Sequence, residues 1–185
     1  MKIKGQIVSS RREFVGEHFG PGAWEKVLAA LPDPDRETLR GTILATGWYE
    51  FELGKRLDDA IVGVLGGGSD EVFEELGAKS ARKNLGGIHR LFLSPGDPQA
   101  LMAKAGVIYR QYYDTGRREY SQTGPVSGVL TTHGAETYSH PDCLTVIGWY
   151  KEALRMCGAR EITAVEEECR ANGGTCCRYR FEWQM

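Results

Sequence analysis

Apolar residues recur every three or four positions through most of the first 113 residues, which is the spacing of an amphipathic helix. Glycine, proline or a capping residue bounds each stretch that shows this spacing. The pattern predicts helices over 12–19, 23–31, 35–43, 47–65, 69–81 and 97–112. We therefore expect a helical part over about 10–113.

Beyond this point the sequence is richer in turn residues and β-branched residues, and polar and apolar positions alternate. The pattern predicts strands over 117–121, 126–133, 161–169 and 176–183, with one helix over 142–157. The order of elements predicts an α+β fold, with an N-terminal helical layer packed on a four-stranded antiparallel sheet and one helix inserted between the strand pairs. We expect one domain over 1–185, with its strand-rich part over about 114–185.

Composition and charge exclude several classes of function. The chain has 185 residues, of which 41% are hydrophobic and 26% charged, and its formal net charge is -2. Without a basic stripe it is not expected to bind nucleic acid. It has neither the apolar run of a signal peptide nor that of a membrane span, so we expect a cytoplasmic protein. Five cysteines, an odd number, suit free or metal-bound thiols better than a disulfide framework.

The cysteines near the C-terminus fall at positions that can meet. In the last predicted strand, alternation places Cys177 on the buried face with three aromatic residues and Cys176 on the solvent face. In helix 142–157, an apolar stripe at helical spacing places Cys143 in the first turn, on the inward face. The predicted hairpin brings Cys169 close to Cys177.

These thiols and one carboxylate suggest a metal site. Cys143, Glu166, Cys169 and Cys177 would satisfy a tetrahedral zinc ion, and four protein ligands imply a structural role with no open position for catalysis. The helix N-terminus would lower the pKa of Cys143. Glu166 and Cys169 lie on opposite faces of a regular strand, so the strand must bend or bulge for both to bind one ion. The alternative is that the cysteines are small buried hydrophobes and 166–168 is an exposed acidic run.

The same four residues carry a resemblance to a known family. Their offsets of 23, 3 and 8 residues resemble the Cys, Glu, Cys, Cys set that holds zinc in 4-vinyl-reductase-type domains, the sensory part of phenol-responsive bacterial regulators. The opening KGQIVSSRREFVGEHFGPGAWEKVLAAL, residues 4–31, resembles the start of haem NO-binding domains. Both families share a ligand-binding fold with subunits of TRAPP transport complexes. The resemblance implies this fold, a bacterial branch of the superfamily and a structural zinc ion.

The haem branch of this superfamily has features that the sequence lacks. It holds the haem propionates with a Tyr-x-Ser-x-Arg signature, and Tyr120 is followed by Ser-Gln-Thr-Gly instead. A haem iron would need His89, His133 or His140, none of which has a recognisable context. We therefore expect zinc as the cofactor and consider haem an unlikely one.

Aromatic residues suggest a function for the interior. Several of them fall in the helices and could line an apolar cavity: Trp48, Tyr49, Phe51, Phe92, Tyr109, Tyr112, Tyr113, Trp149 and Tyr150. The leading hypothesis is a non-catalytic sensor or regulatory domain that binds a small apolar or aromatic ligand, forms a homodimer and signals to a protein partner. The alternative is a ligand-free dimeric interaction module resembling the transport-complex subunits. No catalytic triad or dyad is visible, so an enzyme is not expected.

Overall fold

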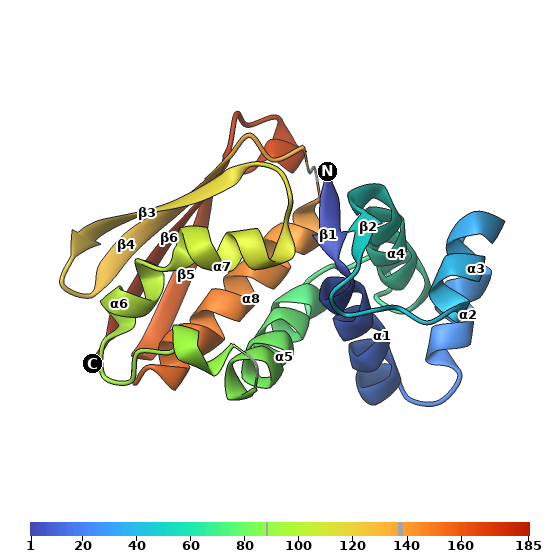
Figure 1. The fold of residues 1–185 in the computed structure, drawn as a ribbon, viewed down its shortest axis with the longest axis horizontal. Coiled ribbons are helices and arrows are strands. Elements are labelled where there is room, and N and C mark those ends of the chain that lie inside the picture. Colours follow the sequence, from blue (N-terminus) through green and yellow to red (C-terminus); the bar gives the residue numbers. More distant parts are fainter. Residues whose placement is uncertain (88, 137–138) are drawn as a thin grey trace.

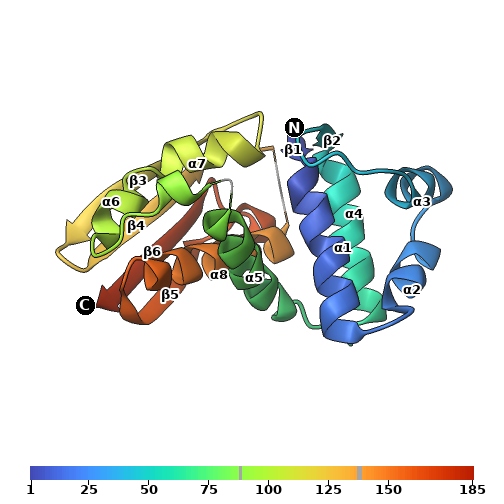
Figure 2. The ribbon, with the colours of Figure 1, turned by 60° about the horizontal axis from the view of Figure 1, so that its bottom comes forward.

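The computed structural model of the chain describes residues 1–87, 89–136 and 139–185. Helices α1 to α4 form one end of the molecule, the larger sheet forms the other, and α5 lies between them (Figures 1 and 2). In chain order the elements are β1 (Lys2–Lys4), α1 (Gly5–Phe19), α2 (Ala23–Ala29), α3 (Asp33–Arg40), β2 (Trp48–Glu50), α4 (Phe51–Val64), α5 (Val72–Gly86), η1 (Arg90–Phe92), α6 (Pro98–Met102), α7 (Ala105–Tyr112), β3 (Arg117–Gly124), β4 (Ser127–His133), α8 (His140–Met156), β5 (Arg160–Glu168), η2 (Arg170–Asn172) and β6 (Cys177–Gln184).

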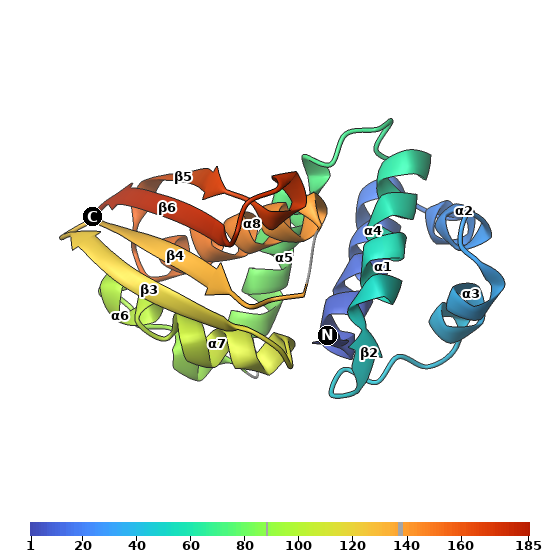
Figure 3. The ribbon, with the colours of Figure 1, turned by 90° about the horizontal axis from the view of Figure 1, so that it is seen from above.

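The larger sheet is antiparallel and has the order β3-β4-β6-β5. In Figure 3 these strands lie side by side with α8 behind them. Burial alternates along β4 and β6, so one face is covered and the other faces solvent. On the covered face, Leu130 of β4 lies opposite Tyr179 of β6, and both are fully buried. The predicted α+β fold with a four-stranded antiparallel sheet is confirmed.

Helices cover the buried face in two layers. Helices α7 and α8 pack on the sheet, and α5 packs closely along α8. Two glycines make this close approach achievable. A Cβ atom on Gly77 would overlap the carbonyl oxygen of Thr145, and one on Gly148 would overlap the carbonyl oxygen of Glu74. The sequence therefore sets the α5–α8 spacing at two points where only glycine fits.

The helical part differs from the sequence prediction at several element ends. Helix α1 begins at Gly5 and not at residue 12, α3 spans Asp33–Arg40 and not 35–43, and α5 spans Val72–Gly86 and not 69–81. Strand β1 and strand β2 pair in register and were not predicted, because runs of three residues are too short for the alternation pattern to reveal. For the same reason the helix predicted over 47–65 begins only at Phe51. The helix predicted over 97–112 is divided into α6 and α7, which Ala103 and Lys104 separate.

No helix within the described residues is both long and apolar enough to cross a membrane.

Candidate functional site

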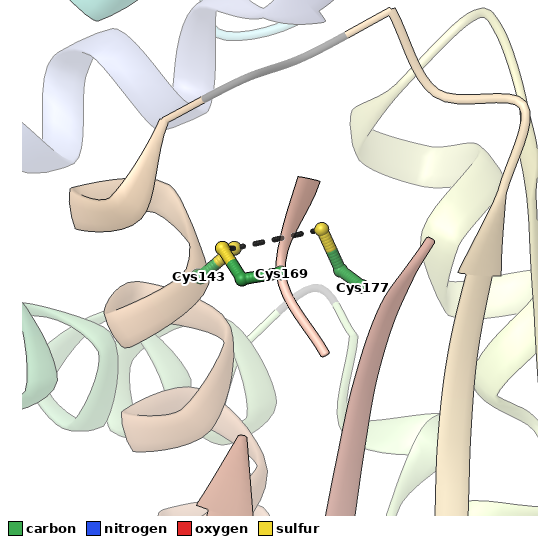
Figure 4. A group of neighbouring side chains, drawn as sticks. All are labelled: Cys143, Cys169 and Cys177. Atoms are coloured by element: carbon green, nitrogen blue, oxygen red, sulfur yellow. Dashed lines mark hydrogen bonds between the residues drawn. The ribbon is translucent and has the colours of Figure 1, made fainter. Parts of the chain in front are cut away.

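Three cysteines from separate segments form a compact thiol cluster. The sulfur of Cys143 lies 3.8 Å from that of Cys169 and 3.7 Å from that of Cys177, and all three sulfurs lie within 4.8 Å of one another (Figure 4). All three residues are buried. Thiolate bonds of about 2.3 Å around a tetrahedral ion separate the sulfurs by about 3.8 Å. The two distances from the sulfur of Cys143 match that separation, and the third pair of sulfurs lies within 4.8 Å.

Local structure positions each thiol. The side chain of Ser139 caps α8 by accepting a hydrogen bond from the backbone N–H of Asp142, which places Cys143 in the first turn, as predicted. Cys169 directly follows β5, and Cys177 begins β6. Gly173 turns the hairpin between them with a φ of 87°, a conformation that favours glycine.

Glu166 adjoins the cluster because β5 is irregular at this point. The pairing of β5 with β6 shifts register between Glu166 and Glu168, and the carboxylate of Glu166 interacts with the thiol of Cys169. Among the described residues, the ligand atoms that lie within 4.8 Å of one another are the three sulfurs alone, so the structure does not bring Glu166 into the compact cluster. One carboxylate oxygen of Glu166 lies 3.5 Å from Nε2 of His140, and the other is buried without a hydrogen-bond partner. A buried carboxylate oxygen with no partner needs a cation or a proton.

The sequence prediction missed His140 as a neighbour of this cluster. It begins α8, and its Nδ1 lies 2.6 Å from a carboxylate oxygen of Asp70. The hydrogen bond to Asp70 raises the pKa of His140. Its position in the polar segment before a helix gave no indication of these contacts.

The three thiols differ in their affinity for protons. The sulfurs of Cys169 and Cys177 raise the pKa of Cys143. In turn the Cys143 thiol lowers the pKa of Cys169 and of Cys177, that of Cys177 to about 6. The predicted lowering of the Cys143 pKa by its helix N-terminus is therefore wrong, because contact with two further sulfurs outweighs it. A metal ion binds thiolates, so its binding would release the protons that these thiols hold, and the lowered pKa values of Cys169 and Cys177 reduce the cost of that release.

Cys176 was predicted on the solvent face, but it is buried. The cause is Glu168, whose carboxylate accepts hydrogen bonds from the backbone N–H and hydroxyl of Thr175 and from the backbone N–H of Cys176. These hydrogen bonds lower the pKa of Glu168 to about 2. The ionised carboxylate thus folds the turn over the thiol of Cys176.

A cavity of about 60 Å³ lies among α1, α5, α7 and α8, near the thiol cluster. Five of its lining side chains are aromatic: Tyr109, Tyr112, Tyr113, Trp149 and Tyr150. Half-buried residues at its edge include Gln6, Ser10 and Ser80. These aromatic residues were among those predicted to line a cavity. The other four that were predicted, Trp48, Tyr49, Phe51 and Phe92, are not part of the lining.

The wall of this cavity contains polar atoms that lack partners. Nε1 of Trp149 and the hydroxyl of Tyr150 are buried, and neither has a hydrogen-bond partner. Burial raises the pKa of Tyr150, so its hydroxyl keeps its proton. Buried polar groups are nearly always paired in native proteins, so two unpaired groups in one cavity wall suggest that a ligand belongs there.

Arg118 adds a buried charge to the same wall. Its side chain is 7% exposed, its Nε donates to the hydroxyl of Thr132 at 2.9 Å, and its guanidinium lies over the rings of Tyr109 and Tyr150. A gap of about 10 Å³ that Arg118 also lines reaches Cys143 and Cys177 of the thiol cluster. Arg118 was not singled out from the sequence. Alternation along the strand could have shown that this arginine faces inward.

A second buried arginine joins the two halves of the molecule. Arg11 of α1 makes two hydrogen bonds to Asp58 of α4, at 3.0 and 3.1 Å, and lies 3.6 Å from Asp142 of α8. The hydroxyl of Tyr113 donates to the carboxylate of Asp142 at 3.0 Å. The cavity wall is thus connected to the N-terminal helices by a continuous polar network, which no local pattern of the sequence indicated.

Comparison with known proteins gives a likeness in fold. No known sequence family matches the chain, and no curated protein does. Among solved structures, a single-site mutant of the Fe(II) unliganded H-NOX protein from K. algicida superposes with a TM-score of 0.75 at 14% identity, over 98% of this chain and 97% of that one. The H-NOX protein from S. oneidensis in the Fe(II)NO ligation state gives 0.72 at 14% identity, over 98% and 99%. A structure from a study of heme distortion in the H-NOX family gives 0.74 at 12% identity, over 98% and 95%.

This likeness confirms one part of the resemblance and corrects the cofactor prediction. The haem NO-binding fold is confirmed, while the likeness to vinyl-reductase-type domains and transport-complex subunits stays a prediction. The prediction that zinc is the cofactor and that haem is unlikely is contradicted, because the structures that share this fold belong to haem proteins and point to haem. The reasoning failed because it sought a binding signature, and the fold persists at identities where such a signature is lost.

The cavity itself tests whether the residues present suit a haem. None of the lining residues is a histidine, cysteine or methionine. His89 adjoins the wall from outside, with its ring centroid 5.8 Å from that of Tyr112. A cavity that holds benzene measures about 150 Å³, so about 60 Å³ is far too small for a porphyrin. As the side chains stand in this structure, the cavity does not fit a haem.

Proposed function

We propose that residues 1–185 form one sensor or regulatory domain that binds a small molecule in the cavity among α1, α5, α7 and α8, without catalysing a reaction. The observation that carries this proposal is the cavity wall, in which the buried Nε1 of Trp149 and the buried hydroxyl of Tyr150 have no partner. A ligand that pairs with these groups gains the hydrogen bonds that the protein alone leaves unmade.

The polar network gives the bound ligand a route to the rest of the molecule. Tyr113 and Arg11 both line the cavity, and both contact Asp142 of α8. Arg11 also holds Asp58 of α4. A ligand that displaces Tyr113 or Arg11 would shift the position of the N-terminal helices relative to α8. Such a shift is how ligand binding would alter the surface that a protein partner reads.

Proteins of this fold bind small ligands in known cases. The S. oneidensis H-NOX protein is described in its Fe(II)NO ligation state, so it binds haem iron and NO. That example supports ligand binding by this chain, and it makes haem an occupant that must be tested directly. The ligand-free interaction module is the weaker alternative. It would need a fully packed interior, whereas this interior has a cavity with unpaired polar groups in its wall. Homodimer formation stays a prediction.

We also propose that Cys143, Glu166, Cys169 and Cys177 bind a thiophilic metal ion that fastens the β5–β6 hairpin to α8. Three observations support this set: the short distances between the three sulfurs, the register shift beside Glu166, and its unpaired buried oxygen. Four protein ligands would leave the ion no open position, which agrees with a non-catalytic domain. The bound ion would fix the positions of Cys143 and Cys177, which line the small gap beside Arg118.

The ligand proposal is tested with two phenylalanine variants of α7. Ile108→Phe places a larger side chain in the cavity wall, whereas Val107→Phe lies on the exposed side of the same helix. Native mass spectrometry and absorption spectra of the purified chain reveal any retained molecule, including haem. A thermal-shift screen of small molecules then finds others. We expect at least one ligand that stabilises the wild type and Val107→Phe, and that Ile108→Phe does not bind. If Ile108→Phe responds to every ligand as the wild type does, the proposed function is wrong.

The metal proposal is tested by elemental analysis of chain purified without chelators. We expect close to one thiophilic ion per chain in the wild type. Cys169→Ser removes a proposed ligand and should lose the ion. Cys157→Ser is the matched control, because Cys157 is also buried but contacts the backbone N–H of Ser94 instead of the cluster. Folded wild type that neither contains a metal nor gives thiolate charge-transfer absorption with Co²⁺ would contradict the proposal.

A further inference from the structure

We propose that the cavity selects a small monocarboxylic acid with a short apolar body, and that its carboxylate binds to Arg118, Tyr150 and Trp149. This inference rests on the proposed function and names the class of ligand. The three side chains are at least nine-tenths buried and belong to the wall of one cavity. Their chemistry is complementary to an anion.

The charge of Arg118 lacks a counter-ion at contact distance. Among the residues that the structure describes, no carboxylate lies within 4.0 Å of its guanidinium. Its Nε donates a hydrogen bond to the neutral hydroxyl of Thr132, and the faces of Tyr109 and Tyr150 lie 5.0 and 5.7 Å from the guanidinium carbon. The guanidinium also interacts with the hydroxyl of Tyr150, and from beyond contact distance its charge opposes the rise in the pKa of Asp142 that burial causes. A buried cation without a paired anion is costly, so a carboxylate supplied by a ligand would be bound strongly.

The acidic groups near the cavity already have partners. Asp142 accepts hydrogen bonds from Tyr113 and lies beside Arg11, and Asp58 accepts both of its hydrogen bonds from Arg11. Neither is therefore free to turn toward Arg118. Of the two arginines that line the cavity, Arg11 has two carboxylates within 4.0 Å and Arg118 has none among the described residues.

The unpaired polar atoms require an acceptor on the ligand. An indole N–H can only donate a hydrogen bond, and a guanidinium can only donate. The Tyr150 hydroxyl, which keeps its proton, can donate as well. Two other polar side chains of the wall are already paired: Gln6 donates to Asn84, and Asn84 donates to the hydroxyl of Tyr112. A ligand with two acceptor oxygens and a negative charge is therefore the chemical complement of the three donors.

The dimensions and the wall limit the rest of the ligand. A volume of about 60 Å³ is less than the roughly 150 Å³ that holds benzene, so only a few atoms fit inside without movement. The wall of aromatic rings favours a flat or slender apolar body. A longer body would extend past the half-buried Ser10 and Ser80 toward solvent.

Isothermal titration of the full chain compares each acid with its neutral amide. The pairs are propionate with propionamide and butyrate with butyramide, which differ in charge at nearly equal shape. A charge-assisted hydrogen bond exceeds a neutral one by enough to change affinity about tenfold. We therefore expect at least one acid to bind about tenfold or more tightly than its amide.

Three variants assign the preference to the proposed side chains. Arg118→Met should abolish the preference for acid over amide. Tyr150→Phe removes one donor but keeps the ring, and should weaken acid binding about threefold to tenfold. It also tests the proposal if Arg118→Met does not fold. Arg117→Gln is the matched control, because the neighbouring side chain is exposed and bonds to Glu119. It should leave both affinities unchanged.

Several results would overturn the inference. Equal affinity for acids and amides, no binding of any probe, or the same effect from Arg117→Gln as from Arg118→Met would each do so. Amides that bind as well as acids and are lost in Ile108→Phe would leave ligand binding intact and remove only the acid class. Haem found in the purified chain would likewise leave ligand binding intact and refute only the proposed class of small acids. Insensitivity of all binding to Ile108→Phe would refute the proposed function as well.

Discussion

Arg11 and Arg118 stand in opposite surroundings, although each is almost completely buried. Arg11, between the N-terminal helices and α8, has Asp58 at 3.0 Å and Asp142 at 3.6 Å. Arg118, in the cavity wall, has a threonine hydroxyl and two aromatic faces. A buried arginine with matched carboxylates maintains the fold, whereas one without them is retained at a cost in stability that a function must explain. The comparison therefore separates a structural group from a binding group.

The largest effect is expected at Arg11. Arg11→Met leaves two buried carboxylates without their cation, and we expect a loss of about 3–5 kcal/mol in the free energy of unfolding, measured with urea. Arg11→Met/Asp58→Leu replaces the pair with apolar side chains and should recover a large part of this loss. If Arg11→Met alone costs less than about 1 kcal/mol, the network does not hold the two halves together.

The next largest effect is expected where α5 packs against α8, because both helices line the cavity. Gly148→Ala forces a Cβ atom against the carbonyl oxygen of Glu74, and we expect it to lower the free energy of unfolding by about 1–3 kcal/mol. Gly63→Ala in α4 is the matched control, because its Cβ atom meets nothing within 4 Å. There the higher helix propensity of alanine should raise stability by roughly 0.5–1 kcal/mol. Equal effects at the two sites would show that the helices separate freely.

A smaller change is expected at Arg118. Arg118→Met removes the hydrogen bond to Thr132 and two ring contacts, but it also removes the cost of burying an unpaired charge. We expect the free energy of unfolding to stay within about 1 kcal/mol of the wild-type value, or to rise, in the same urea experiment. A loss as large as that of Arg11→Met would show that Arg118 is structural, and the comparison would fail.

The sequence predicted the thiol cluster better than it predicted the cavity, for a physical reason. Cys169 and Cys177 flank one hairpin turn, and Cys143 lies on the inward stripe of one helix, so local periodicities place all three. The sequence also indicated an irregularity in this strand, because Glu166 and Cys169 would lie on opposite faces of a regular strand, and the structure has a register shift between Glu166 and Glu168. What ion, if any, binds there is not contained in those periodicities.

The cavity depends on contacts between distant parts of the chain. Arg118 and Trp149 lie on different elements, and the pairing of Arg11 with Asp58 spans 47 residues. Local patterns indicate which face of an element is buried, but not which of its buried polar groups will find partners. The short strands β1 and β2 were missed for a similar reason, since each depends on its partner for stability and not on its own three residues.

The smallest effect is expected from a titrating group at the edge of the cavity wall. His89 stacks on Phe92 and meets Tyr112 edge-on, and burial lowers its pKa from 6.5. Because the folded chain then binds this proton more weakly than the unfolded chain, stability falls as the pH drops below about 6.5 and is unaffected well above it. His89→Phe keeps a ring in place and removes the proton site. We expect the variant to lose less thermal stability than the wild type between pH 7 and pH 5. Identical pH profiles would show that the pKa of His89 is the same in the folded and the unfolded chain. Burial at this edge of the wall would then impose no cost on the protonated imidazole.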